Sequence, residues 1–140
     1  MASHSVASVM SYELRVQSTP GYLHVQVTGA NTPEVVSSYV QEVLKLCASR
    51  RSRALLVEEN LAGPGLPLAE IYHIITNGSE FPLAHQLTVA FVNVNTEHPP
   101  GNVAFAETVA RNRGINLRAF RTVKLAQSWL CEVAGTPAGR

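Results

Sequence analysis

Residues 54–75 read ALLVEENLAGPGLPLAEIYHII, and this stretch decides how the chain folds. Its first four residues, 54–57, form a short continuous apolar run, which is typical of a strand buried on both faces of a parallel sheet. Pro67 suits the first turn of a helix. The residues that follow place four apolar side chains on one predicted inner helical face: Leu68, Ile71, Tyr72 and Ile75. A buried strand, a loop and an amphipathic helix thus occur in succession, as in an α/β domain.

Two strands and a helix are predicted before this stretch. Apolar and polar residues alternate along 12–17 and again along 23–27, so residues 11–28 read as a hairpin with one polar face. Thr32 can cap a helix that has Pro33 in its first turn and Glu34 at the positive end of its dipole. This helix places apolar residues on one face as far as Cys47.

The same alternation of strands and helices continues after residue 75. Residues 87–94 form a second buried apolar run, and a third helix is predicted from a cap at Asn102 to Gly114. A last strand over 115–119 leads to a helix capped by Thr122. Its predicted apolar stripe has five members: Leu125, Ala126, Trp129, Leu130 and Val133.

The predicted element order is therefore ββαβαβαβα, an α/β domain with a mixed five-stranded sheet and four helices. The length of 140 residues suits one domain. We expect residues 10–134 to form it, with a disordered N-terminus over 1–9 and a disordered tail over 135–140.

Composition excludes several classes of function. Eleven basic and ten acidic residues give a net charge of +1, which offers no electrostatic reason to expect a nucleic-acid partner. All ten acidic residues are glutamates, so motifs that require aspartate are absent. No apolar run is long enough to span a membrane and no secretory leader is recognised, so a cytoplasmic protein is expected. Cys47 and Cys131 are expected to be buried thiols.

The loop predicted over residues 58–67 contains no serine, threonine, histidine or cysteine. Its glycines and prolines allow a sharp bend that exposes backbone groups and apolar side chains. One interpretation is a tight connection only. The other is the lip of a pocket for a small apolar ligand, which Leu61 and Leu66 would face.

Polar residues at the predicted carboxyl edge of the sheet are a second candidate site. Glu58, Glu59 and Asn60 follow one strand, and a later loop carries Glu97 and His98. Together they could bind a metal or perform acid–base chemistry. No metal-ligand spacing supports this, so neither a metal nor a cofactor is predicted, and solvated loop residues are the simpler interpretation.

A family resemblance is carried by the segment FAETVARNRGINLRAFRTVKLAQSWL at residues 105–130. A helix, a short strand ending in Phe120, and a helix with Ala126 and the pair Trp129–Leu130 resemble the closing segment of the STAS fold (sulfate transporter and anti-sigma-factor antagonist). Within that fold the chain is most similar to the bacterial SpoIIAA-like proteins. The resemblance covers about residues 11–133.

In the anti-sigma-factor antagonists of this family, a serine after the third strand is phosphorylated. The matching residues 58–67 offer no hydroxyl, so this switch is not expected here. The resemblance implies a non-enzymatic binding or regulatory module that recognises a protein partner or itself, for example as a dimer. One alternative is a small carrier of apolar, lipid-like molecules, held by Leu61, Leu66, Leu68, Ile71, Tyr72 and Ile75. A weaker alternative is a hydrolase that uses Glu97 and His98.

Overall fold

The computed structural model describes residues 12–133, and these contain one five-stranded mixed sheet. The strands lie in the order of the chain: β1 (Tyr12–Thr19), β2 (Tyr22–Ala30), β3 (Ala54–Ala62), β4 (Thr88–Asn93) and β5 (Asn116–Phe120). β1 pairs with β2 antiparallel, and all other neighbours are parallel. The predicted α/β class and the predicted order of elements are confirmed. The segments predicted to be disordered, residues 1–9 and 135–140, lie outside the described residues.

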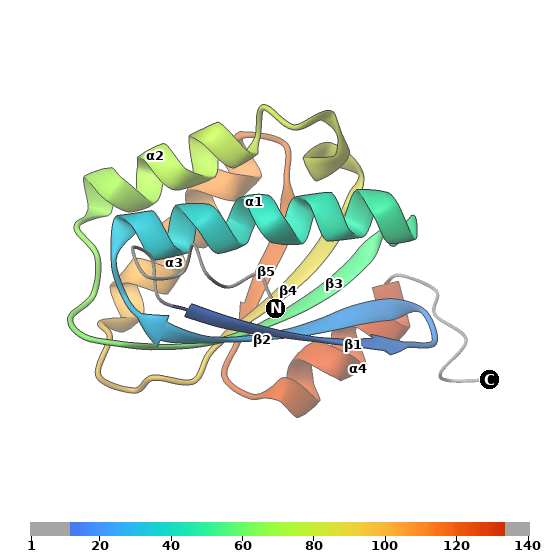
Figure 1. Ribbon diagram of the computed structural model, residues 1–140, viewed down its shortest axis with the longest axis horizontal. Coiled ribbons are helices and arrows are strands. Elements are labelled where there is room, and N and C mark those ends of the chain that lie inside the picture. The colour runs from blue at the N-terminus through green and yellow to red at the C-terminus, as the bar shows by residue number, and fades with distance from the viewer. Residues whose placement is uncertain (1–11, 134–140) are drawn as a thin grey trace.

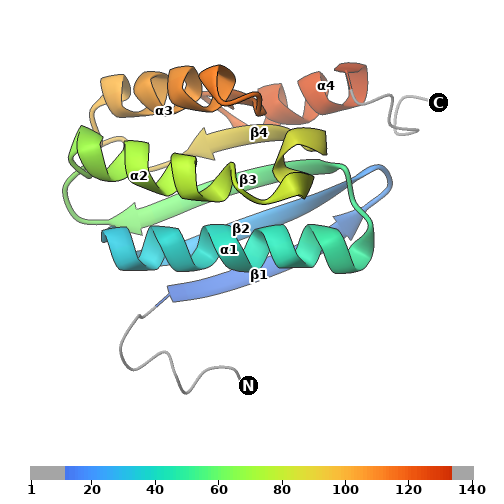
Figure 2. The ribbon, with the colours of Figure 1, turned by 90° about the horizontal axis from the view of Figure 1, so that it is seen from above.

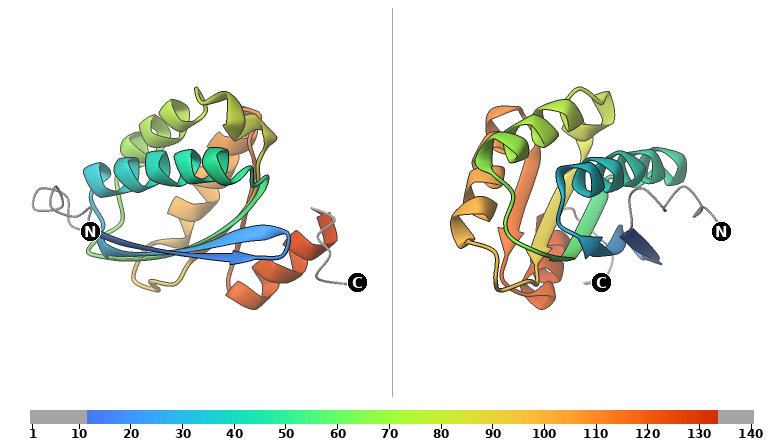
Figure 3. Two further views of the ribbon diagram at one scale, coloured as in Figure 1. Left: turned by 45° about the vertical axis from the view of Figure 1, so that its right-hand side comes forward. Right: turned by 60° about the vertical axis from the view of Figure 1, so that its left-hand side comes forward.

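Three helices form one layer above the sheet, and a fourth lies below it (Figure 1). The elements are α1 (Pro33–Arg50), α2 (Leu68–Gly78), the short 3₁₀-helix η2 (Pro82–Gln86), α3 (Pro100–Asn112) and α4 (Val123–Val133). Seen from above, α1, α2 and α3 lie side by side over the sheet (Figure 2). The left view of Figure 3 shows α4, in red, against the opposite face of the sheet. Within residues 12–133, no helix is both long and apolar enough to cross a membrane.

The sheet separates two apolar clusters, and β3 contributes to both. Leu55 and Val57 face the three-helix layer, whereas Ala54 and Leu56 face α4. This explains why residues 54–57 are apolar without alternation, since each successive side chain meets a covered face. The predicted buried parallel strand is therefore confirmed.

β3 is longer than predicted, because residues 58–62 continue the strand and only residues 63–67 form the loop before α2. Beyond Val57 the side chains still alternate between faces. Glu59 and Leu61 are buried on the side of the helix layer, whereas Asn60 on the opposite face is exposed. The interpretation of Glu59 as a solvated loop residue is thus wrong.

The predicted caps are partly confirmed. The Thr32 hydroxyl accepts a hydrogen bond from the Val35 amide at 3.2 Å, and the Thr122 hydroxyl accepts one from the Leu125 amide at 3.2 Å. Asn102 is not a cap, because α3 begins two residues earlier and the Asn102 side chain binds a loop carbonyl instead. Proline at position 100 allows this earlier start, since it needs no hydrogen-bond partner for its nitrogen.

Four apolar side chains predicted to face inward are exposed to solvent: Leu68, Tyr72, Leu125 and Val133. In α2, Ile74 and Gly78 occupy the buried face, and the Tyr72 ring turns outward under the Arg113 guanidinium, 5.5 Å from the ring centre. In α4, only Ala126 and Leu130 are buried. Helices as apolar as these carry more apolar residues than one contact face accommodates, so periodicity does not identify the buried ones.

Candidate functional site: an apolar cavity with one polar end

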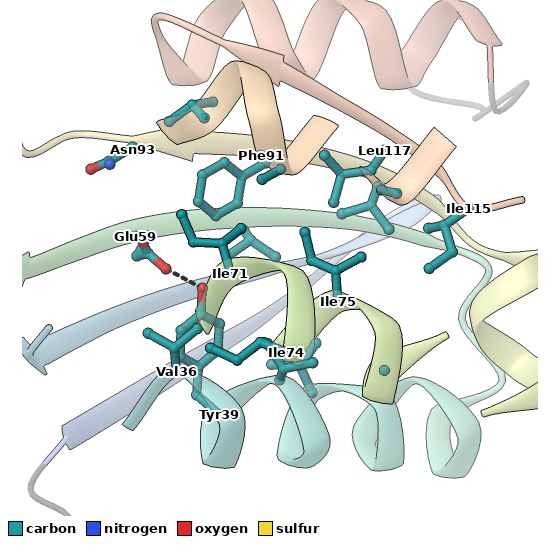
Figure 4. Close-up of a pocket in the computed structure, with 18 of the residues that line it drawn as sticks. Val36, Tyr39, Glu59, Ile71, Ile74, Ile75, Phe91, Asn93, Ile115 and Leu117 are labelled. Carbon is teal, nitrogen blue, oxygen red and sulfur yellow. Dashed lines mark hydrogen bonds between the residues drawn. The ribbon is translucent and has the colours of Figure 1, made fainter. Parts of the chain in front are cut away.

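An apolar cavity of about 210 Å³ lies between the three-helix layer and the sheet. Its walls come from α1, α2 and α3 above, and from β3, β4 and β5 below. Isoleucine side chains of α2 and the Phe91 ring of β4 face each other across it (Figure 4). A cavity of roughly 150 Å³ lined by apolar side chains accommodates a benzene molecule. This cavity is therefore large enough for a small organic molecule.

The polar lining residues lie at the end of the cavity formed by the carboxyl ends of β3 and β4. Glu59 of β3 and Asn93 of β4 are paired in register there, whereas Leu55 and Val89 are paired near the start of the same strands. Figure 4 shows Glu59 and Asn93 at one end and Ile115 at the other. The cavity thus has an apolar body and one polar end.

Glu59 is the acidic residue of this polar end, and only 7% of its surface is exposed. One carboxyl oxygen, Oε2, accepts a hydrogen bond from the Tyr39 hydroxyl of α1. Burial raises the pKa of Glu59 above its ordinary value, while the Tyr39 hydrogen bond and the nearby His98 oppose this rise. Burial and the Glu59 carboxylate raise the pKa of Tyr39 well above its ordinary value, so Tyr39 remains a hydrogen-bond donor.

His98, which is 8% exposed, uses both ring nitrogens within the protein. Its Nε2 lies 2.8 Å from the Gly63 carbonyl oxygen, which can only accept, so Nε2 carries the hydrogen. The Asn93 side-chain oxygen accepts from the Asn95 amide, which turns the Asn93 nitrogen toward His98 Nδ1 at 3.1 Å. This hydrogen-bond pattern places a hydrogen on Nε2 and orients Nδ1 toward the Asn93 amide nitrogen. Burial is the largest of the effects that act on the pKa of Glu59.

The segment over residues 61–66 is held by its backbone carbonyl groups. Asn95 Nδ2 donates to the Leu61 carbonyl oxygen, and the backbone N–H of Asn31 donates to that of Ala62, both at 2.7 Å. The three further bonds are His98 to Gly63, Asn31 Nδ2 to Pro64 at 2.8 Å, and Asn102 Nδ2 to Leu66 at 3.0 Å. Every donor belongs to another loop or to the start of α3. The segment therefore needs no reactive side chains of its own in order to be fixed in place.

Gly65 allows the loop to approach α3 closely. A Cβ atom at this position would lie 2.7 Å from Asn102 Nδ2 and 2.9 Å from the Pro99 ring. Both distances are shorter than normal contacts, and the proline ring cannot rotate away. Since Gly65 and Leu66 line the cavity, this close contact holds one part of its wall in place.

The predicted ligand-binding residues divide into three groups. Leu66, Ile71 and Ile75 line the cavity. Leu61 is fully buried in the core, and Leu68 and Tyr72 are exposed, so these three do not line the cavity. The sequence placed Glu59 and His98 together at this edge but as solvated loop residues, whereas both are buried, and it missed Tyr39. The sequence signal that could have revealed the burial of Glu59 is its spacing from Val57 and Leu61, which places all three side chains on one face of the strand.

Glu97 and His98, the residues proposed for a hydrolase, point into different environments. Glu97 is exposed and His98 is buried. In the described part of the chain, no hydrogen bond or ion pair joins them. Among residues 12–133, no group of three histidine, cysteine or acidic side chains is arranged to hold a metal ion. Cys47 is buried, and this raises the pKa of its thiol to about 11.

No protein-family model matches the chain, and a search of curated proteins gives no significant match. The functional argument therefore rests on the site itself.

The first prediction concerns Glu59 and pH. An acid whose pKa is higher in the folded than in the unfolded chain binds more protons when folded, so folding becomes more favourable as pH falls. Glu59→Gln keeps an oxygen for Tyr39 and removes the buried charge. We expect a higher free energy of unfolding than wild type at pH 8, measured by urea denaturation. The gain should vanish near pH 4, because the unfolded carboxyl then also becomes protonated, with a pKa of about 4.3.

The titratable groups that face Glu59 are Tyr39 of α1 and His98 of the loop before α3, and both are unchanged in this variant. Glu97→Gln is the matched control, since Glu97 is exposed on that loop. A gain that has the same size at pH 4 and pH 8, or that also appears in Glu97→Gln, contradicts the prediction.

Proposed function

We propose that this chain is a small STAS-like binding protein that holds one small apolar molecule in the cavity between the three-helix layer and the sheet. The observation that carries the proposal is the cavity of about 210 Å³ with its isoleucine and phenylalanine walls. Ligand sites are typically apolar hollows that contain a few placed polar groups. The polar end formed by Glu59, Tyr39 and His98 supplies such groups.

The position of the cavity supports the same proposal. In open α/β sheets, ligands bind beyond the carboxyl ends of the strands. The polar end lies at this edge, where Gly65 and Leu66 form part of the cavity wall. A regulatory module with a protein partner, as the STAS resemblance implies, stays a prediction, as does a cytoplasmic location.

Filling the cavity tests the proposal. Ala106 lines the cavity from α3, whereas Ala104 of the same helix is exposed. We expect Ala106→Phe to abolish binding of a small apolar probe such as 1-heptanol, and Ala104→Phe to leave it unchanged. At ten times the dissociation constant, binding stabilises wild type by about 1.4 kcal/mol. This raises the melting temperature by roughly 3–8 °C, measured by differential scanning calorimetry.

Two results would count against the proposal. One is the absence of any shift in wild-type protein with apolar probes of different shapes. The other is an equal shift in Ala106→Phe and wild type. Native and then denaturing mass spectrometry of the purified protein adds an independent check, because a ligand retained from the host appears as extra mass that disappears on denaturation.

A further inference from the structure

The polar end of the cavity has spare hydrogen-bond acceptors. The side-chain nitrogens of Asn31, Asn93, His98 and Asn102 each already make a hydrogen bond within the protein. In contrast, Glu59 Oε1 and the side-chain oxygens of Asn31 and Asn102 accept none from the described residues. A ligand that pairs with these oxygens must therefore donate a hydrogen bond.

Of these acceptors, Glu59 Oε1 is expected to form the strongest hydrogen bond with a ligand. Glu59 is more than nine-tenths buried, lines the cavity, and uses only its other oxygen, for Tyr39. A hydrogen bond to a charged group is stronger than one between neutral groups. An apolar ligand with a donor at this point would gain this bond as well as its apolar contacts.

We propose that the ligand is a small apolar alcohol whose hydroxyl group donates to Glu59 Oε1 while its hydrocarbon part fills the isoleucine-lined body of the cavity. This inference rests on the proposed function and specifies its ligand class. A hydroxyl group both donates and accepts, so it matches the Glu59 carboxyl in its ionised and in its protonated form. A fatty acid of the same length does not, because two carboxylates would face each other in an apolar cavity.

Cavity size limits the length of the ligand. If about 150 Å³ accommodates the six carbon atoms of benzene, then the volume here suits roughly eight non-hydrogen atoms. 1-Heptanol has this size. Its isomer hexyl methyl ether has the same atoms but cannot donate a hydrogen bond, and heptanoate carries a charge at the same end. These three compounds differ only in the head group.

The experiment measures the dissociation constants of the three compounds for wild-type protein by isothermal titration calorimetry at pH 7.5. We expect 1-heptanol to bind at least about tenfold more tightly than heptanoate and more tightly than the ether, since a hydrogen bond to a charged group is strong. In Glu59→Gln, the new amide can donate to a carboxylate. The difference between 1-heptanol and heptanoate should then shrink to less than about threefold, while Glu97→Gln should retain the wild-type ratio.

The outcomes separate the two proposals. Equal binding of all three compounds, or tighter binding of heptanoate, overturns the alcohol inference and leaves the apolar cavity as a binding site. Failure of all three to bind wild-type protein overturns the proposed function as well. The wild-type comparison requires no substitution, so it remains decisive if Glu59→Gln does not fold.

Discussion

Leu130→Ala is expected to lower the free energy of unfolding by about 2–5 kcal/mol, the usual cost of truncating a fully buried leucine. Leu130 lies on α4 and has no exposed surface. Among residues 12–133, α4 is the only helix on its face of the sheet (Figure 3). No neighbouring helix can move into the space that the truncation leaves, so we expect little compensation.

The measurement is urea denaturation followed by far-ultraviolet circular dichroism. Leu125→Ala is the matched control, because Leu125 belongs to the same helix but is 53% exposed. Its effect should stay within roughly 0.5 kcal/mol, as for other surface substitutions. Similar losses of unfolding free energy in both variants would show that helix formation, and not burial against the sheet, determines how α4 contributes to stability.

His98→Ala is expected to cost about 2–4 kcal/mol and to loosen the part of the cavity wall formed by Gly65 and Leu66. The substitution leaves the Gly63 carbonyl without its donor and the Asn93 side chain without its acceptor. A buried polar group that loses its partner costs about 1–3 kcal/mol. Since the same histidine fixes the segment over residues 61–66, affinity for 1-heptanol should fall together with stability.

Chemical rescue makes this prediction specific. Millimolar imidazole should raise the melting temperature of His98→Ala and leave that of wild type unchanged, because free imidazole can occupy the vacated space and restore both hydrogen bonds. His73→Ala provides the control, since His73 is exposed on α2. If imidazole stabilises His73→Ala equally, or has no effect on His98→Ala, the assigned role of the ring is wrong.

The sequence predicts the fold better than it predicts the site, for a physical reason. Buried strands such as β3 and caps such as Thr32 are encoded by residues close together in the chain, so local patterns reveal them. The expectation that two loops meet at the carboxyl edge of the sheet also follows from parallel topology. Which polar groups meet there depends on pairs such as Asn31 with Pro64 and His98 with Gly63, which are 33 and 35 residues apart.

Glu59 illustrates the remaining difficulty. Charged residues rarely occupy a core position, so a pattern-based reading ends the strand at Val57 and leaves the glutamate in solvent. Only the tertiary structure provides the Tyr39 hydroxyl that makes its burial tolerable. The exposed Leu68 and Tyr72 show the converse error, because apolar spacing alone does not determine which side of α2 meets the sheet.

The way the segment over residues 61–66 is fixed has a consequence for how this protein can change. The five hydrogen bonds that reach it from other loops and from α3 all end on main-chain oxygens, which every amino acid possesses. Leu66 can therefore be exchanged for a larger or smaller side chain without losing any of these attachments. The shape of the cavity wall at Leu66 and the integrity of the fold can then vary independently, which suits a scaffold whose ligand preference is altered by evolution or by engineering.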